Sequence, residues 1–390
     1  MKRIRIILTL LLIVFTVAIV VLLAILLGLV AVRSPQASED VNGLSFVRAI
    51  YAFGPDSSQL ITPASVAFVP GSTDIWCADQ ANYRLVGFNF DGTYRSLFFE
   101  DSDGEGFDFP SDIAISNDGW FYVAQSSYNK VTVYNPQRGF EQKLESPSPM
   151  SVAVSDDLVV VGCVPGFALF TRDGTYLKWV GTRGSGDDQF DTINGVALDD
   201  EDNIYIVDTY NNRLSKYSKD AVRIWMVSLG PAGNATTVPT ATDDATDFIM
   251  QTPMGLTIDG AGRIVLIDNQ SFSIAAFDAH DGHLLGTWGG YGSGDGQLLY
   301  PADISYNART DTFVIADTGN SRLQIVRIPE SGAHLAAGLE RNVRGPLRAC
   351  LIPFLVVFLT GSTLTLYFVG RKKWRTKRAS VSRTEDFNEN

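Results

Sequence analysis

The stretch NGVALDDEDNIYIVDTYNNRLSKYS, Asn194 to Ser218, decides the fold of this chain of 390 residues. An apolar segment, NGVALD, is followed by the acidic turn DEDN and by a second apolar segment, IYIVD. A polar turn then leads into RLSKYS. Short apolar or alternating runs bounded by Asn, Asp and Gly are typical of β-strands joined by tight turns. The stretch therefore predicts consecutive strands of one small sheet.

The same pattern occurs six times between Gly43 and Ile328. The other copies begin at Pro63, Pro110, Pro149, Pro253 and Pro301, and a complete unit contains four short strand-like segments. Spacings of 47, 39, 44, 60 and 48 residues separate the first-strand anchors, which are Val66, Ile113, Val152, Val196, Leu256 and Ile304. A period near 40–50 residues with four strands per unit is typical of propeller blades. We therefore predict an all-β, six-bladed β-propeller over residues 43–328.

The two ends of the repeat region complement each other. The sixth copy stops after its third strand, Arg322 to Ile328, whereas the segment from Ser45 resembles the fourth strand and linker that start at His283. We predict that Ser45–Phe53 supplies the missing strand of the last blade, which closes the ring and leaves no open sheet edge. The chain then enters and leaves the ring on one face, opposite the linkers between blades.

The repeat resembles the NHL family of β-propellers. The residues that carry the likeness form Asp-x-x-Asn-x-Arg signatures, and the linkers GTRGSGDDQF and GGYGSGDGQLLYP also fit it. Blade two has Gln125 and Lys130 in the Asp and Arg places, and blades three and five lack the signature. We expect the signature Asp to accept hydrogen bonds from the turn and to pair with the Arg, which holds neighbouring blades together. These residues are Asp79, Asn82, Arg84, Asp208, Asn211, Arg213, Asp317, Asn320 and Arg322.

Two hydrophobic segments flank the repeats. Residues 6–32 carry no charge, and a helix of that length would cross a bilayer with some tilt. A cleaved secretory signal is the alternative, although its apolar core is normally only about 7–15 residues long. The second segment, residues 349–370, is followed by the basic tail 371–390, and Lys/Arg-rich flanks stay in the cytoplasm. We therefore predict a two-pass cell-membrane protein with residues 1–5 and 371–390 inside, joined to an extracytoplasmic ring by linkers 33–42 and 329–348.

The predicted ring is strongly acidic. Residues 43–328 hold 17 Lys and Arg against 36 Asp and Glu, a balance of −19. Such a surface repels phosphate backbones, so nucleic acid is not an expected partner. The linkers concentrate the acids on one face, where they would select a basic partner; the alternative is a merely solvated surface.

Enzymatic chemistry would need ligands or acids that converge on the central channel. The three histidines do not: His280 and His283 lie in a predicted third-to-fourth turn, and His334 lies beyond the ring. Asp112 and Asp303 precede first-strand anchors in blades two and six, and Asn194 is one position away in register. Together they could bind Ca²⁺ through oxygen ligands at the channel mouth. The alternative is that the two acids bond backbone N–H groups in the linkers.

These observations favour a membrane-tethered, extracytoplasmic module that binds or scaffolds a protein of a cell-envelope or transport complex. We expect no catalytic residues and no cofactor, with the partner in or near the same membrane. The rival is a Ca²⁺-dependent extracytoplasmic hydrolase or lyase with its site at the channel mouth.

Overall fold

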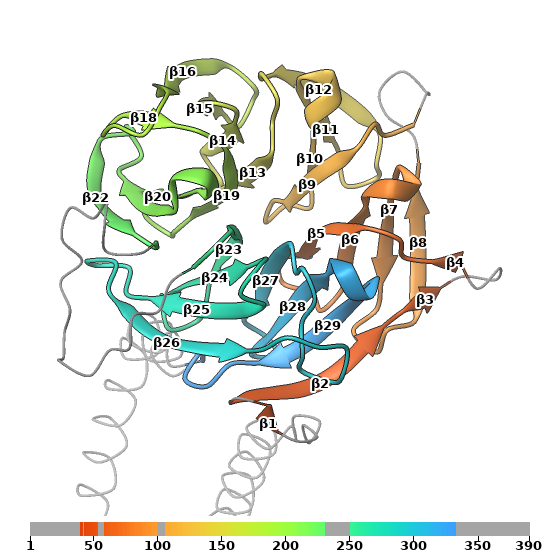
Figure 1. The fold of residues 1–390 in the computed structure, drawn as a ribbon. Helices are drawn as coiled ribbons and strands as arrows, with labels where there is room; N and C mark the ends of the chain where they lie inside the picture. The colour runs from red at the N-terminus through yellow and green to blue at the C-terminus, as the bar shows by residue number, and fades with distance from the viewer. Residues whose placement is uncertain (1–39, 42, 54–57, 100–105, 231–249, 333–390) are drawn as a thin grey trace, which may run out of the picture. The chain divides into compact units, whose positions relative to one another are not determined.

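A computed structural model describes residues 40–41, 43–53, 58–99, 106–230 and 250–332. Within these residues, six antiparallel sheets of four or five strands surround a central axis (Figure 1). The first strands of successive sheets contact one another in turn, and the sixth contacts the first. The described part of the chain is therefore a closed ring, and the prediction of an all-β, six-bladed propeller is confirmed.

The blades follow one another along the chain. Blade one has β5 (Pro63–Phe68), β6 (Ile75–Asp79), β7 (Arg84–Phe88) and β8 (Tyr94–Phe98); blade two has β9 (Pro110–Ile115), β10 (Phe121–Gln125), β11 (Lys130–Tyr134) and β12 (Phe140–Glu145). Blade three has β13 (Ser151–Val154), β14 (Leu158–Cys163), β15 (Gly166–Thr171) and β16 (Tyr176–Val180); blade four has β19 (Ile193–Leu198), β20 (Ile204–Asp208), β21 (Arg213–Tyr217) and β22 (Arg223–Ser228). Blade five has β23 (Pro253–Ile258), β24 (Ile264–Asp268), β25 (Ser273–Phe277) and β26 (Leu284–Gly289); blade six has β27 (Asp303–Asn307), β28 (Thr312–Asp317), β29 (Arg322–Arg327) and β2 (Leu44–Ile50).

The core lies between the blades. The second strands read as unbroken apolar runs, such as LVVVGC in β14, because both faces of each strand are covered by neighbouring blades. Six apolar clusters fill the six blade interfaces; the cluster between blades six and one, for example, joins Val314 and Ile325 to Val66 and Phe88. The fourth strands are more exposed, because they form the outer rim.

The predicted closure by the N-terminal strand is confirmed. Strand β2 pairs antiparallel with β29, and Ser45 lies opposite Arg327. Two details differ from the prediction. The pairing ends at Ile50, since Ala52–Phe53 (β3) turns away to pair with Ser58–Gln59 (β4) in the following linker. In addition, Asp40–Val41 (β1) folds back at Gly43, whose φ of +79° suits glycine, and adds a fifth strand to the last sheet.

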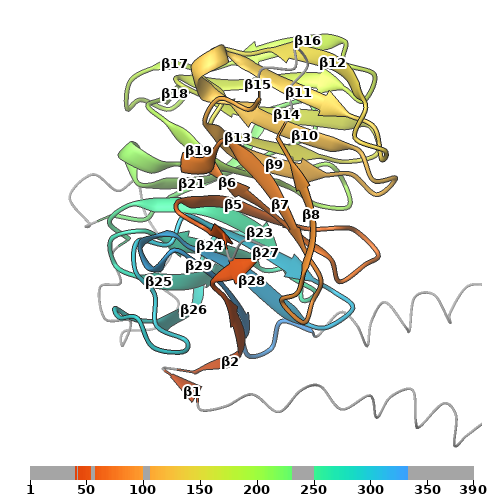
Figure 2. The same cartoon turned by 90° about the vertical axis from the view of Figure 1, so that its right-hand side faces the viewer.

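The turns of every blade divide between two faces. The turns from second to third strands contact the linkers from fourth to first strands: Asn82 Nδ2 donates to Gln59 O, Asn211 Nδ2 to Gly184 O and Asn320 Nδ2 to Gly292 O. We call this side the linker face, and the opposite side, with the first-to-second and third-to-fourth turns, the hairpin face. The register of β2 and β29 brings the chain into and out of the ring side by side at the hairpin face, as predicted (Figure 2).

The predicted membrane anchors, residues 6–32 and 349–370, lie outside the described residues, as does the basic tail. In the region that the structure does describe, the helices are short 3₁₀ turns such as Gln80–Asn82, and no helix has the length and hydropathy needed to cross a bilayer.

Shortening a side chain in the interface between blades six and one tests how much this interface contributes to the free energy of unfolding. Ile325 is fully buried between blades six and one, so Ile325→Ala should lower the free energy of unfolding by about 2–5 kcal/mol. Ile224, 53% exposed on the outer strand β22, is the matched control, and Ile224→Ala should change it by only about 0.5 kcal/mol. Equal losses in urea titrations of the two variants would contradict this placement of the core.

Candidate functional site

A buried carboxylate joins the incoming linker to the second strand in blades one, four, five and six. In blade one, Asp79 is fully buried at the end of β6, and its Oδ1 accepts the N–H groups of Ile61 (2.9 Å) and Thr62 (3.4 Å) in the incoming linker. Its Oδ2 accepts bonds from Asn82 Nδ2 (2.7 Å) and Arg84 Nε (2.8 Å). The carboxylate thus satisfies linker N–H groups that would otherwise be buried without partners.

The same arrangement recurs in blades four and six. Asp208 and Asp317 accept linker N–H groups of Asp191 and Leu299, and each forms a salt bridge with the Arg five residues later, at 2.5 and 2.7 Å. Asn211 and Asn320 each donate to the same carboxylate and to a linker carbonyl. The Arg side chains extend further along the linkers; Arg322 Nη2 donates to Gly294 O (2.8 Å) and Gln297 O (2.9 Å).

Two blades retain the linker bond without the full signature. In blade two, Gln125 Oε1 accepts the N–H of Asp108 at 3.0 Å, so an amide replaces the carboxylate. In blade five, where the three-residue signature is absent from the sequence, Asp268 accepts the N–H groups of Gln251 (2.6 Å) and Thr252 (3.2 Å). The three-residue pattern does not detect Asp268, although its place at the end of the apolar run IVLID marks it as an acceptor of this kind.

The central channel holds a cavity of about 250 Å³ lined by the first strands of all six blades. The structure brings the three predicted residues Asp112, Asp303 and Asn194 to this one cavity. The residues just before the six first-strand anchors occupy equivalent places around it. In blade order they are Ser65, Asp112, Ser151, Gly195, Gly255 and Asp303.

The two aspartates connect neighbouring blades around the channel. Asp303 Oδ2 accepts the N–H of Val66 in blade one at 2.9 Å, and Asp112 Oδ2 accepts the N–H of Val152 in blade three at 2.7 Å. Between them, the Ser65 hydroxyl donates to Asp112 Oδ1 at 2.5 Å. A side chain on Gly255 would lie 2.1 Å from Asp303 Oδ1, which explains a glycine there. Hydrogen bonds therefore run without a gap from blade six to blade three.

Burial makes this pair of carboxyl groups reluctant to ionise. It raises the pKa of Asp303 to about 6, and burial together with the nearby charge of Asp303 raises the pKa of Asp112 well above its usual range. Two interacting acids of this kind titrate as a pair. Near neutral pH the pair therefore resists carrying two full negative charges.

Asn194 is engaged elsewhere within the ring. Its Nδ2 donates to Thr209 Oγ1 at 2.9 Å and lies 3.5 Å from Met254 Sδ in blade five. Binding of Ca²⁺ by Asp112, Asp303 and Asn194 stays a prediction. Both aspartates accept backbone N–H groups in the first strands of their own and neighbouring blades, rather than in the linkers, where such bonds were predicted.

The linker face carries exposed aromatic side chains, a feature that the repeat pattern does not predict. They lie in linkers or in second-to-third turns, and their exposed fractions run from 42% to 70%: Tyr51, Tyr83, Phe109, Tyr128, Tyr210, Tyr291 and Tyr300. Tyr83 and Phe109, from blade one and the next linker, make an edge-to-face contact with centroids 5.3 Å apart. Large exposed aromatics gathered on one face are typical of protein-binding surfaces.

Acidic side chains accompany these aromatics. Asp187, Asp188 and Asp295 are exposed in linkers of the described chain, and Arg223 pairs with the first two at 3.4 and 3.6 Å. Two further predicted linker acids, Asp108 and Asp191, are half-buried, and those at positions 100–105 and 243–247 lie outside the described residues.

Comparisons with known proteins agree with the repeat. A family model described as NHL repeat matches residues 190–217. Two curated relatives are both named NHL repeat-containing protein 3: the human protein is 28% identical over 148 residues, 37% of this chain and 38% of its own length. The mouse protein is 27% identical over 235 residues, 57% of this chain and 60% of its own length. The chain thus spans less than two thirds of either relative. Among solved structures, Kuenenia stuttgartiensis hydrazine synthase aligns over 70% of this chain and 97% of that chain, with a TM-score of 0.47 and 9% identity.

The buried linker clamp should matter far more than an exposed ion pair on the same face. Arg322→Leu leaves Asp317 charged and buried, so we expect a loss of about 3–5 kcal/mol in the free energy of unfolding. Arg183 pairs with Asp191 at 3.4 Å but is 61% exposed, and Arg183→Leu should cost about 1 kcal/mol or less. Urea unfolding followed by circular dichroism measures both, and a loss at Arg322 no larger than that at Arg183 would be incompatible with the clamp.

The channel carboxyl pair predicts a pH dependence. Because the folded-state pKa of Asp303 is about 6 and its usual value is 3.8, its contribution to stability is fully present below pH 3.8 and is lost as the pH rises through 6. Asp303→Ala should therefore destabilise the ring more at pH 4 than at pH 7.5, by up to about 3 kcal/mol. Asp295→Ala, on an exposed linker, is the control. The same effect of Asp303→Ala at both pH values would refute this assignment.

Proposed function

We propose that the ring is a protein-binding or scaffolding module that captures a partner on the linker face, a role that its similarity to NHL-repeat proteins favours. The observation that carries this proposal is the set of exposed aromatic side chains on that face. Tyr210 and Tyr291 are exposed by 70% and 69%, so a partner that covered them would gain free energy from the burial of both rings.

The chemistry of the face favours a partner rich in Lys or Arg. Tyrosine faces attract cations, and the neighbouring carboxylates of Asp187, Asp188 and Asp295 add a negative field. The described part of the face also contains Arg183, so its charge is not uniform. A basic segment of a protein would find both aromatic contact area and ion partners there.

We further propose that the ring is tethered outside the cytoplasm by residues 6–32 and 349–370, with both termini in the cytoplasm. The apolar length of the two segments and the basic tail support this topology. The adjacent positions at which β2 begins and β29 ends are compatible with it, because both tethers would then leave the hairpin face. The linker face would point away from the membrane, toward a partner in a cell-envelope or transport complex.

A Ca²⁺-dependent hydrolase or lyase at the channel is the weaker proposal. Asp112 and Asp303 share one cavity, which favours it, but their oxygens already accept backbone N–H groups. Among the described residues that line the cavity there is no histidine to act as a base or ligand. Calorimetric titration of the full-length chain with Ca²⁺ tests it directly.

Removal of the exposed rings tests the binding face. In affinity capture from intact membranes followed by mass spectrometry, Tyr210→Ala combined with Tyr291→Ala should abolish or strongly reduce recovery of the partner. Tyr176→Ala is the matched control, because Tyr176 is 56% exposed on the outer strand β16 and not on the linker face. Retention of the partner by the double variant, or its equal loss in the control, would exclude the linker face as the docking surface.

A reporter fusion tests the topology. A C-terminal fluorescent protein that folds only in the cytoplasm should be active, and externally added protease should cut the ring in intact cells while sparing the tail. A reporter that is active only outside the cell would overturn the two-pass arrangement.

A further inference from the structure

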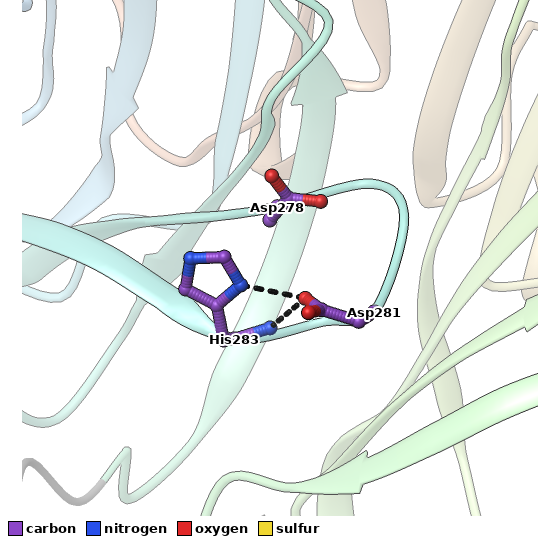
Figure 3. Close-up of side chains that lie close together, drawn as sticks. All are labelled: Asp278, Asp281 and His283. Atoms are coloured by element: carbon purple, nitrogen blue, oxygen red, sulfur yellow. Dashed lines mark hydrogen bonds and ion pairs between the residues drawn. The ribbon is translucent and has the colours of Figure 1, made fainter. Parts of the chain in front are cut away.

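The third-to-fourth turn of blade five concentrates metal-binding side chains on the hairpin face. The sequence between β25 and β26 is DAHDGH, Asp278 to His283, and it holds two of the three histidines of the chain. One carboxylate oxygen each of Asp278 and Asp281 and one ring nitrogen of His283 lie within 4.8 Å of one another. Figure 3 shows the His283 ring and the two carboxylates gathered around this turn.

The turn holds these side chains in a defined conformation. Its ends are joined by a bond from the Asp278 N–H to His283 O at 2.9 Å, and the Gly282 N–H donates to Asp278 O at 2.8 Å. His283 Nδ1 lies 2.6 Å from Asp281 Oδ1, which also accepts the His283 backbone N–H at 3.1 Å. The orientation of the imidazole is therefore set before any ion arrives, a condition for useful affinity.

Side chains of blade four contact the turn and help to hold its conformation. Lys216 Nζ and Trp225 Nε1 both donate to Ala279 O, at 3.1 and 3.4 Å. A side chain on Gly282 would lie 2.9 Å from Val227 Cγ1, so the turn packs closely against β22. Lys216 also lies 3.9 Å from Asp199, which offsets part of its charge. The carboxylate of Asp281 and the ring of His283 remain reachable from solvent, with side chains 48% and 28% exposed.

We infer that Asp278, Asp281 and His283 form a surface site for a borderline divalent cation such as Zn²⁺. One imidazole nitrogen with two carboxylate oxygens suits Zn²⁺, whereas Ca²⁺ prefers sites made entirely of oxygen. Ligand atoms bound to one tetrahedral Zn²⁺ lie about 3.3 Å apart, and the three ligand atoms here lie within 4.8 Å of one another, so side-chain shifts of about 1–2 Å within the turn would bring them to that spacing. Water would complete the coordination. This site is separate from the linker face and goes beyond the proposed protein binding.

Zn²⁺ titration of the full-length chain in detergent, after treatment with a chelator, tests the inference by calorimetry. We expect one saturable site, and His283→Ala and Asp281→Asn should each raise its Kd by about tenfold or more. His280→Asn is the matched control, because it removes an imidazole from the same turn but not from the ligand set; it should leave the Kd unchanged. Millimolar Ca²⁺ should not compete.

Thermal unfolding of each variant without Zn²⁺ should match the unsubstituted chain, which separates lost ligands from lost folding. The absence of saturable Zn²⁺ binding, an unchanged Kd in His283→Ala, or an equal loss in His280→Asn would each overturn the site. Competition by Ca²⁺ would also overturn it, because binding would then reflect negative charge alone.

Discussion

The ring depends on one recurring interaction, the hydrogen bond from the N–H groups of a linker to a buried acceptor at the end of the second strand. A linker that crosses between blades passes over apolar strand ends, where unpaired N–H groups would cost free energy. Asp79, Asp208, Asp268 and Asp317 supply the acceptor as carboxylates, and Gln125 supplies it as an amide. The acceptor lies on the second strand of a blade, and the donors lie in the linker that enters the same blade. Every such bond therefore helps to set the orientation of that blade relative to the preceding one.

The sequence predicted the architecture because the strand pattern is periodic and the two ends of the repeat are complementary. The repeat region begins with a segment that resembles a fourth strand and ends one strand short, so its two ends can pair in one simple way. Strand β2 pairs with β29 as predicted. Details that depend on packing were not accessible. The added strand β1 arises from a turn at Gly43, and the early end of β2 arises from pairing within the next linker. Neither feature recurs in the other repeats, so the periodicity of the sequence does not predict it.

The candidate sites divide in the same way. Register alone placed Asp112 and Asp303 before their anchors, and the structure brings both to the channel. Register could not show that Ser65 connects them or that the amide of Asn194 is bonded to Thr209, since those contacts join different strands. The aromatic surface of the linker face was missed because a Tyr in a turn has the same sequence signature whether it is buried or, as for Tyr210, exposed by 70%. Asp268 was not predicted for another reason. The bond to the linker needs only one acceptor side chain, whereas the family signature consists of three residues.

Closure by β2 also has a consequence for synthesis. Ser45 lies opposite Arg327, so one of the first strands to be made must wait for one of the last. At about 5–20 residues per second, the ribosome needs roughly 15–55 s to produce the intervening chain. Throughout that time the edge of β2 that pairs with β29 in the finished ring has no partner strand, and such an edge can pair with another nascent chain. Contacts of such long sequence separation also form slowly. Synthesis of this ring therefore includes a period in which the nascent chain is prone to aggregation, and a chaperone would be most useful during that period.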